Sequence, residues 1–135
     1  MEINLPRVVR RHSSISGWGV FAGGPINKNR RIVTYEGELI DNREADKRGW
    51  RYLRKGEIWC FRINRRWLRD ASCHGNIARF LNHSCRPNCY VQVVKHDIWI
   101  CAARNIAPGE ELTYNYSAGA ENISCRCQPG CTRSL

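Results

Sequence analysis

Two short polar segments of the chain carry residues that could do chemistry. Residues 82–85 read NHSC, and residues 113–116 read TYNY. Tyr114 and Tyr116 are separated by one residue, so in a β-strand both phenol rings lie on the same face. Phenol hydroxyls at such positions can orient a nucleophile and stabilise developing positive charge. The same spacing also fits two half-buried aromatics of a sheet, and His83 taken alone reads as an ordinary surface histidine.

The eight cysteines divide into two kinds. The segment 125–131, CRCQPGC, places three thiols within seven residues beside a Pro-Gly pair suited to a tight turn. Structural zinc sites use four tetrahedral ligands, so a fourth must come from elsewhere, with Cys85 as the expected donor and Cys89 as the alternative. Without zinc, the segment would be an unstructured tail. Three further cysteines lie in strand-like runs and are expected to be small buried side chains: Cys60, Cys73 and Cys101.

Length and composition indicate one globular domain. The chain has 135 residues, of which 42% are hydrophobic, and no run approaches the roughly 18 apolar residues of a membrane helix. The first residues, MEINLPRVVRRHS, lack the apolar centre of a secretory signal, so we expect an intracellular protein: cytoplasmic in a bacterium, nuclear in a eukaryote, with export as an effector as the alternative. The net charge of +10 favours an anionic partner.

Short apolar runs separated by turn residues predict a mostly β fold. Residues 7–26 read as strand, turn, strand, and residues 31–40 as a second strand pair. Residues 58–63 and 66–72 form a predicted hairpin, residues 90–94 and 97–103 another. Pro108–Gly109 predicts a type II turn before the final strand. No internal repeat is apparent.

One or two short helices are predicted between the strands. Asp41 and Glu44 form a capping-box signature that opens a short helix within residues 41–55, although Gly49 weakens it by about 1 kcal/mol. Residues 75–83 carry apolar side chains at the spacing of one or two helical turns. Four cations of the first helix share one face and offer a surface for nucleic acid or an acidic protein: Lys47, Arg51, Arg54 and Lys55.

Residues 17–19, GWG, permit close approach of a ligand to the backbone, with Trp18 as a lid, although such turns commonly join strands. Tyr35, Trp59 and Phe61 lie on predicted strands, where each alone reads as core. The chain has no carboxylate pair, no Ser/His/Asp arrangement and no phosphate-binding loop, which gives hydrolase and phosphotransfer chemistry no support.

Five segments in this order resemble SET-domain protein lysine methyltransferases with a cysteine-rich post-SET tail: GWGVFA, YEGELI, GNIARFLNHSCRPNC, IAPGEELTYNY and CRCQPGC. The resemblance covers residues 8–131. It implies a SET domain over residues 1–118, with a short insert at about 41–57, and a zinc-binding post-SET tail over 119–135. The implied fold has several small curved β-sheets and a pseudoknot, in which the segment of Tyr114 threads through an upstream loop and brings NHSC beside TYNY.

The resemblance also implies roles for residues. S-adenosylmethionine would lie on one side of the pocket, and a protein lysine would enter from the other through an aromatic channel. The implied catalytic residues are Tyr116, Tyr114 and Tyr35, and the channel residues are Tyr35, Phe61, Tyr114 and Tyr116. The implied cofactor-binding residues are Ser16, Gly17, Trp18, Gly19, Trp59, Arg79, Asn82, His83 and Tyr116. The implied zinc ligands are Cys85, Cys125, Cys127 and Cys131.

The chain departs from the family pattern at several positions. Trp59 stands where a tyrosine that helps to hold the cofactor is common, and Asn115 replaces a common aspartate. Three residues separate Cys127 from Cys131 where four are usual. By analogy, Tyr114 favours mono- or limited methylation.

The leading hypothesis is an S-adenosylmethionine-dependent protein-lysine N-methyltransferase acting on a histone or another basic, nucleic-acid-associated protein. Because the chain itself is basic, we expect such a substrate to be used best when bound to nucleic acid. One alternative is a catalytically weak SET-fold module that recruits protein or DNA. The other is a zinc-stabilised DNA-binding domain that needs no cofactor.

Overall fold

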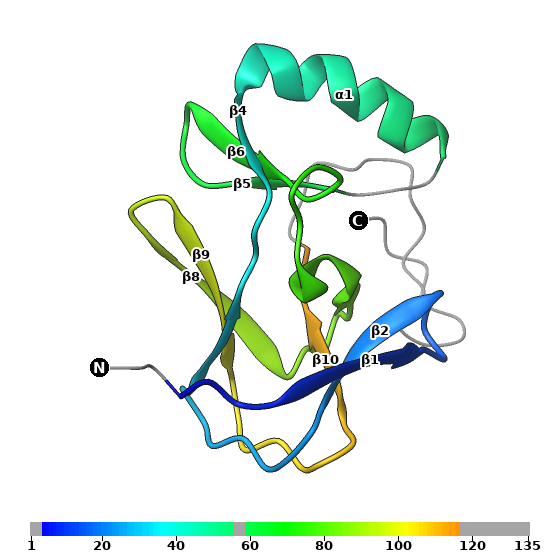
Figure 1. Cartoon of the computed structure of the whole chain (residues 1–135), viewed down its shortest axis with the longest axis vertical. Helices are drawn as coiled ribbons and strands as arrows, with labels where there is room; N and C mark the ends of the chain where they lie inside the picture. Colours follow the sequence, from blue (N-terminus) through cyan, green and yellow to red (C-terminus); the bar gives the residue numbers. More distant parts are fainter. Residues whose placement is uncertain (1–3, 56–58, 117–135) are drawn as a thin grey trace.

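The computed structural model describes residues 4–55 and 59–116, which form three small β-sheets, one α-helix and one 3₁₀ turn (Figure 1). The first sheet has the order β1 (Val8–His12), β2 (Trp18–Ala22), β10 (Glu111–Tyr114), β7 (Asn82–His83). The second has the order β3 (Arg31–Thr34), β9 (Asp97–Ala102), β8 (Cys89–Val94). The third has the order β4 (Glu38–Asp41), β6 (Trp67–Asp70), β5 (Cys60–Arg62). The prediction of a mostly β fold is confirmed.

The helix α1 (Asn42–Arg54) begins where the capping signature predicts. The Asp41 carboxylate accepts a hydrogen bond from the Glu44 N–H at 3.0 Å, which satisfies one of the unpaired donors of the first turn. The helix continues through Gly49 for 13 residues and is longer than expected. Within the described residues, no helix is long and apolar enough to cross a membrane.

The predicted turns are also present. Gly109 has φ +85°, and the Glu110 N–H donates to the Ala107 carbonyl at 3.2 Å, as a Pro-Gly type II turn requires. The β8–β9 hairpin reverses at Lys95, which has φ +56°. The second predicted helical segment is a single 3₁₀ turn, η1 (Ile77–Phe80), capped by the Asn76 side chain.

Two expectations about residues 31–73 are wrong. The strands β3 and β4 do not pair with each other: β3 pairs with β9, whereas β4 pairs with β6, because the chain crosses from one sheet to the next between them. A local pattern specifies a strand but not its partner. Among the cysteines expected to be buried, Cys101 is buried and Cys60 half-buried, but Cys73 is exposed, because it lies in a turn after the end of β6.

The structure contains a repeat that the sequence does not make apparent. Two turns, one in residues 22–35 and one in residues 102–114, bond to each other reciprocally. The Ile26 N–H donates to the Ile106 carbonyl at 2.9 Å, and the Ile106 N–H donates to the Ile26 carbonyl at 2.8 Å. We call these segments the first and second turn units.

The remaining bonds of the turn units follow the same symmetry. The Asn29 N–H donates to the Ala102 carbonyl at 2.7 Å, and the equivalent Gly109 N–H donates to the Ala22 carbonyl at 2.8 Å. Both Asn29 and Gly109 have positive φ, at +69° and +85°. The first unit runs into β3, which ends at Thr34 and is followed by Tyr35. The second runs into β10, which ends with Thr113 and Tyr114. Each unit therefore contributes one tyrosine, Tyr35 or Tyr114, to the core of the molecule.

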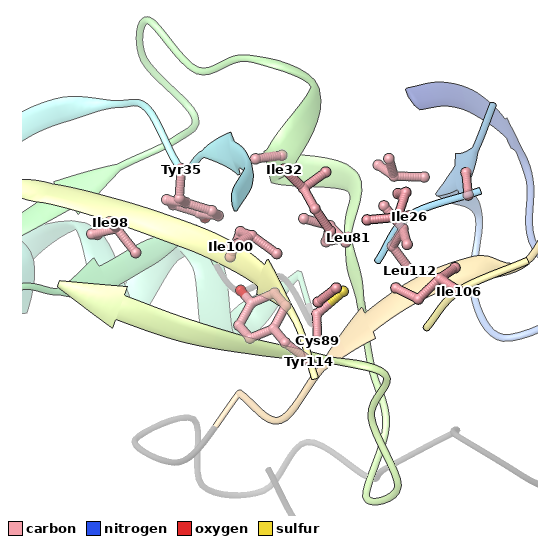
Figure 2. Close-up of a cluster of buried hydrophobic side chains, with 14 of the residues drawn as sticks. Ile26, Ile32, Tyr35, Leu81, Cys89, Ile98, Ile100, Ile106, Leu112 and Tyr114 are labelled. Atoms are coloured by element: carbon pink, nitrogen blue, oxygen red, sulfur yellow. The ribbon is translucent and has the colours of Figure 1, made fainter. Parts of the chain in front are cut away.

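The two turn units lead into one continuous core (Figure 2). Burial of these side chains supplies the main favourable free energy of folding. Tyr35 and Tyr114 belong to this cluster, with 4% and 6% of their surface exposed. The isoleucine and leucine side chains of the cluster are Ile26, Ile32, Ile63, Leu81, Ile98, Ile100, Ile106 and Leu112.

Candidate active site

The strand β10 brings the two polar segments of the sequence side by side. It pairs in parallel with β7, so that Thr113 lies opposite Asn82 and Tyr114 opposite His83. On its other side it pairs antiparallel with β2. The last strand of the described chain is therefore an inner strand of its sheet, between segments that precede it by many residues (Figure 1).

A buried side chain that sequence reasoning missed fixes β10 in this place. Asn88 is 5% exposed. Its Nδ2 donates to the Glu111 carbonyl at 2.8 Å, and its Oδ1 accepts from the Thr113 N–H at 2.9 Å. Asn88 thus replaces a β-strand partner. Its position within the NHSCRPNC segment was the available signal.

Four aromatic residues expected in a substrate channel form one contiguous row. The ring centroids of Tyr35 and Phe61 are 5.2 Å apart, those of Phe61 and Tyr114 5.8 Å, and those of Tyr114 and Tyr116 4.8 Å. His83 continues the row, 5.3 Å from Tyr116 in an edge-on arrangement. These separations are typical of favourable aromatic pairs, so the row holds its shape without a ligand.

The three tyrosine hydroxyls of the row differ in their partners. Tyr35 donates to the Trp59 carbonyl at 2.8 Å, and Tyr116 donates to the Leu81 carbonyl at 2.5 Å. The Tyr114 hydroxyl makes no hydrogen bond within residues 4–55 and 59–116. Burial raises the pKa of all three phenols above the ordinary value, so they are neutral at physiological pH. They can donate hydrogen bonds but cannot act as bases.

His83 is a neutral, structural neighbour of Tyr116. Its Nδ1 accepts the Tyr116 N–H at 3.0 Å, so the ring proton is assigned to Nε2, which lies 3.4 Å from the Cys85 sulfur. Burial lowers the pKa of His83, which favours the neutral ring. The imidazole therefore fixes the backbone that carries Tyr116.

The GWG loop is held by the side chain of Asn82. The Asn82 Nδ2 lies 3.1 Å from the Ser16 carbonyl, 3.1 Å from the Trp18 carbonyl and 2.8 Å from a carboxylate oxygen of Glu111. The amide group of Asn82 is thereby committed to the loop backbone. Asn82 shapes the expected cofactor loop through these bonds.

Glu111 is the second residue of this site that sequence reasoning missed. Both of its carboxylate oxygens accept from the Ser13 hydroxyl, at 2.7 and 2.8 Å. A Cβ atom at Gly19 would lie 2.4 Å from the Glu111 Oε2, so no side chain fits at position 19 without moving this carboxylate. Gly17, with φ +45°, supplies the turn of the loop. The signal was the position of Glu111 in the GEEL segment, directly before TYNY.

Cations and aromatic rings alternate along the edge of the loop. The Arg10 guanidinium lies 4.4 Å from the Trp18 ring centroid and 5.0 Å from that of Phe80. Arg79 lies 5.0 Å from Phe80 and 5.1 Å from Trp59. Cation–π contacts of this kind orient the rings. Trp18, Trp59 and Arg79 were expected here; Arg10, Phe80 and His12, which stacks on Trp18 at 4.1 Å, were not.

The predicted zinc site is only partly within the described residues. Cys85 is half-buried beside His83, whereas the other three predicted ligands, Cys125, Cys127 and Cys131, lie outside the described residues. In residues 4–55 and 59–116, no group of three or more His, Cys, Asp or Glu side chains could hold a metal ion. Cys89, the alternative ligand, is 2% exposed and packs in the core.

Comparison with known proteins places this architecture in a family. A model described as "SET domain" matches residues 17–117. The chain is 42% identical over 130 residues to an H3 lysine-4 specific histone-lysine N-methyltransferase of Yarrowia lipolytica, covering 88% of this chain and 11% of that protein. It is 44% identical over 123 residues to the protein of the same name from Schizosaccharomyces pombe, covering 85% of this chain and 13% of that protein.

A third relative, a histone-lysine N-methyltransferase of Dictyostelium discoideum, is 38% identical over 138 residues, which cover 96% of this chain and 9% of that protein. The chain thus spans about a tenth of the length of these relatives. The similarity extends over nearly all of the present chain, including the loop, the NHSC segment and the TYNY segment. The chain therefore belongs to the SET-domain family.

Proposed function

We propose that the chain is an S-adenosylmethionine-dependent protein-lysine N-methyltransferase, and that its substrate is a histone or another basic, nucleic-acid-associated protein. The observation that carries the proposal is the link between the aromatic row and the GWG loop: the Tyr116 N–H bonds His83, and the preceding residue, Asn82, bonds the loop carbonyls. The named histone-lysine N-methyltransferases among its relatives support the same reaction. They also support a nuclear location in a eukaryotic cell.

The loop side of the site fits a cofactor with an anionic end. The Arg79 Nε is buried and has no hydrogen-bond partner within the described residues. A buried donor without a partner is costly, which favours a ligand that accepts from it. In our proposal Arg79 binds the carboxylate of S-adenosylmethionine, and the other cofactor-binding residues contact the rest: the exposed loop residues Ser16, Gly17 and Trp18, and Gly19, Trp59, Asn82, His83 and Tyr116.

Bound S-adenosylmethionine supplies an electrophilic methyl group. Tyr35, Phe61 and Tyr114 enclose the aliphatic part of the substrate lysine and exclude water from its amine. Lysine ordinarily has a pKa near 10.4, and an apolar channel beside a sulfonium charge disfavours the ammonium form. Because the neutral tyrosines are not bases, the amine must lose its proton to bulk water before it enters the channel. Alignment of the amine in a narrow channel gives a large entropic advantage.

The hydroxyls then have separate tasks in the proposed reaction. Tyr116, bonded to the Leu81 carbonyl, is held next to the methyl transfer, and Tyr35, bonded to the Trp59 carbonyl, keeps the channel wall in place. The Tyr114 hydroxyl has no partner in the described residues and can bind the amine or a water, which limits the number of methyl groups added. These are roles in orientation and charge stabilisation.

The direct test is a methyl-transfer assay with radiolabelled cofactor on histones and on cell extract. Tyr116→Phe removes the hydroxyl and keeps the ring, and we expect the rate to fall about a hundredfold, the usual effect of losing one positioned donor. Tyr90→Phe, a change at an exposed tyrosine of β8, is the matched control. Undiminished labelling by Tyr116→Phe would contradict the role of Tyr116.

The zinc site remains a proposal with a structural purpose. Zinc bound by Cys85, Cys125, Cys127 and Cys131 would fasten the cysteine-rich segment 119–135 next to His83 and Tyr116. Metal analysis of the purified chain should give one zinc per molecule, and Cys85→Ser should lower this occupancy. Full zinc content in Cys85→Ser would remove Cys85 from the ligand set, whereas no zinc in the unmodified chain would refute the site.

We further propose that nucleic acid holds the substrate near the basic face of α1 formed by Lys47, Arg51, Arg54 and Lys55. All four side chains are exposed. Methylation of a basic protein should rise when DNA is added, because DNA links two cationic partners that repel each other. An equal rate on a bare basic peptide, insensitive to DNA, would contradict this expectation.

The alternative function is a SET-fold binding module with weak catalysis. Trp59, in place of a common cofactor-binding tyrosine, and Asn115 support it. Isothermal titration separates the two functions, because an inactive module would release little heat with S-adenosylmethionine.

A further inference from the structure

The helix α1 presents an exposed row of cations with one aromatic ring in its middle. Arg43, Lys47, Trp50 and Arg54 follow one another at spacings of four, three and four residues, which places them in one row on an α-helix. Trp50 is 71% exposed, more than any other large apolar side chain that the structure describes. We call the row and its two exposed basic neighbours the α1 stripe: Arg43, Lys47, Trp50, Arg51, Arg54 and Lys55.

Three carboxylates near α1 bond Arg48, which is not part of the α1 stripe. Arg48 bonds Glu38 at 2.6 Å, Glu44 at 2.9 Å and the fully buried Asp70 at 3.0 Å. Tyr52 also donates to Asp70, at 2.6 Å. These bonds orient the helix on the third sheet and hold three carboxylates around one guanidinium.

The cations of the α1 stripe form no ion pair within the described residues. Every ion pair within residues 4–55 and 59–116 involves Arg48 or Arg104, and neither belongs to the α1 stripe. Two carboxylates of α1 adjoin the stripe: Asp46, which is exposed, and Glu44, which bonds Arg48. Two carboxylates beside five cations leave a net positive surface.

The turn between β5 and β6 extends this surface. Asn42 donates to the Arg65 carbonyl at 2.8 Å, which fastens the turn to the first residue of α1. Three arginines are exposed here: Arg62 at the end of β5, and Arg65 and Arg66 on the turn. The turn therefore adds positive charge near the first turn of α1, a helix about 20 Å long.

We propose that the α1 stripe binds single-stranded nucleic acid, with phosphates on the cations and a base stacked on Trp50. An aromatic ring flanked by cations is the arrangement that binds unpaired bases without regard to sequence. This inference deepens the proposed role of the basic face of α1, and it stands without methyl transfer.

The composition of the stripe favours this partner over others. Protein interfaces have a core depleted of charge, whereas Trp50 is the one apolar side chain among the six residues of the stripe. In a duplex the bases stack on each other, so a ring on a protruding helix meets phosphates and sugars instead. An unpaired strand offers both an exposed base face and its phosphates to the same surface.

The test is fluorescence anisotropy with the full chain, without cofactor, and labelled oligo-dT or oligo-rU of about 20 nucleotides. Trp50→Ala should weaken binding about tenfold, and Trp50→Phe, which keeps a stacking ring, should bind within about threefold of the unmodified chain. The triple change of Lys47, Arg51 and Arg54 to Gln should reduce the slope of log affinity against log salt by about two.

A matched triple change removes the same charge elsewhere, at the exposed residues Arg11, Lys28 and Lys95. It should keep most of the salt slope. The proposal is overturned if Trp50→Ala binds oligo-dT and oligo-rU like the unmodified chain, if a duplex of equal length binds more tightly, or if the two triple variants behave alike. Circular dichroism confirms that each variant is folded. Tyr116→Phe should bind the oligonucleotides normally, which separates this proposal from the proposed catalysis.

Discussion

The two turn units share one backbone geometry but carry opposite charges after the turn. Behind its positive-φ residue, the first unit continues with Arg30 and Arg31, and the second continues with Glu110 and Glu111. The two units bond to each other through equivalent peptide groups, so their backbones are constrained alike. The difference between them lies in the side chains.

Because of this difference, the first unit stabilises a sheet, whereas the second unit shapes the candidate site. The Arg31 guanidinium lies 5.0 Å from the Trp99 ring and bonds the exposed Gln92 at 3.3 Å, which ties neighbouring strands of the second sheet together. The equivalent Glu111 bonds Ser13 and Asn82 and thereby shapes the GWG loop. The two units have the same backbone geometry, and each places one tyrosine in the aromatic row. Only the second unit carries an acidic residue, Glu111, that also shapes the GWG loop.

Of the changes that test this comparison, removal of the Glu111 carboxylate should have the largest effect. Glu111→Gln loses an acceptor of charge-assisted bonds from Ser13 and Asn82, so we expect S-adenosylmethionine to bind about thirtyfold more weakly. Arg31→Gln changes the equivalent residue of the first unit and should bind the cofactor within about twofold of the unmodified chain. Isothermal titration measures both. Equal losses in the two variants would show that the units do not differ in this function.

Changes at the positive-φ residues should have the next largest effect. Gly109→Ala places a Cβ at φ +85°, so we expect the free energy of unfolding to fall by about 1–2 kcal/mol. Asn29→Gly, at φ +69° in the first unit, relieves the equivalent strain and should leave stability within about 0.5 kcal/mol. Urea denaturation is the measurement. A large loss in Asn29→Gly would mean that its side chain, which accepts from Tyr90, dominates.

The smallest effects are expected at Tyr35 and Tyr114, the tyrosines that the two units contribute to the aromatic row. Tyr35→Phe removes the bond to the Trp59 carbonyl and should cost about 1 kcal/mol of stability. Tyr114→Phe removes a hydroxyl without a partner in the described residues, so stability should hold while products with more methyl groups appear. Urea denaturation and mass spectrometry of the methylated product test the pair. Unchanged product distributions in Tyr114→Phe would contradict the role proposed for its hydroxyl.

Local signals in the sequence predicted much of the fold. Asp41 marks the start of α1, Pro108–Gly109 marks a turn, and the hairpin at Lys95 follows from two flanking apolar runs. Each of these depends on a few adjacent residues, which is why the sequence alone sufficed. The partners of β3 and β4 depend on strands elsewhere in the chain, and their pairing was predicted wrongly.

In the candidate site, too, some residues were predicted from the sequence and others were missed. The four residues of the aromatic row were named from the family resemblance, and the structure brings them together. Asn88 and Glu111 were missed, because a polar residue in a loop gives no sign of which distant backbone it will bond. The turn units share few identical residues, so their symmetry is visible in hydrogen bonds and not in the sequence.

The inner position of β10 has a consequence for synthesis of the protein. As the last described strand, β10 emerges from the ribosome after both of its neighbours, β2 and β7, and they cannot close the sheet until it arrives. A nascent chain that stops before residue 111 has neither the strand nor either tyrosine of TYNY. A chain that is cut before residue 111 therefore completes neither the first sheet nor the aromatic row.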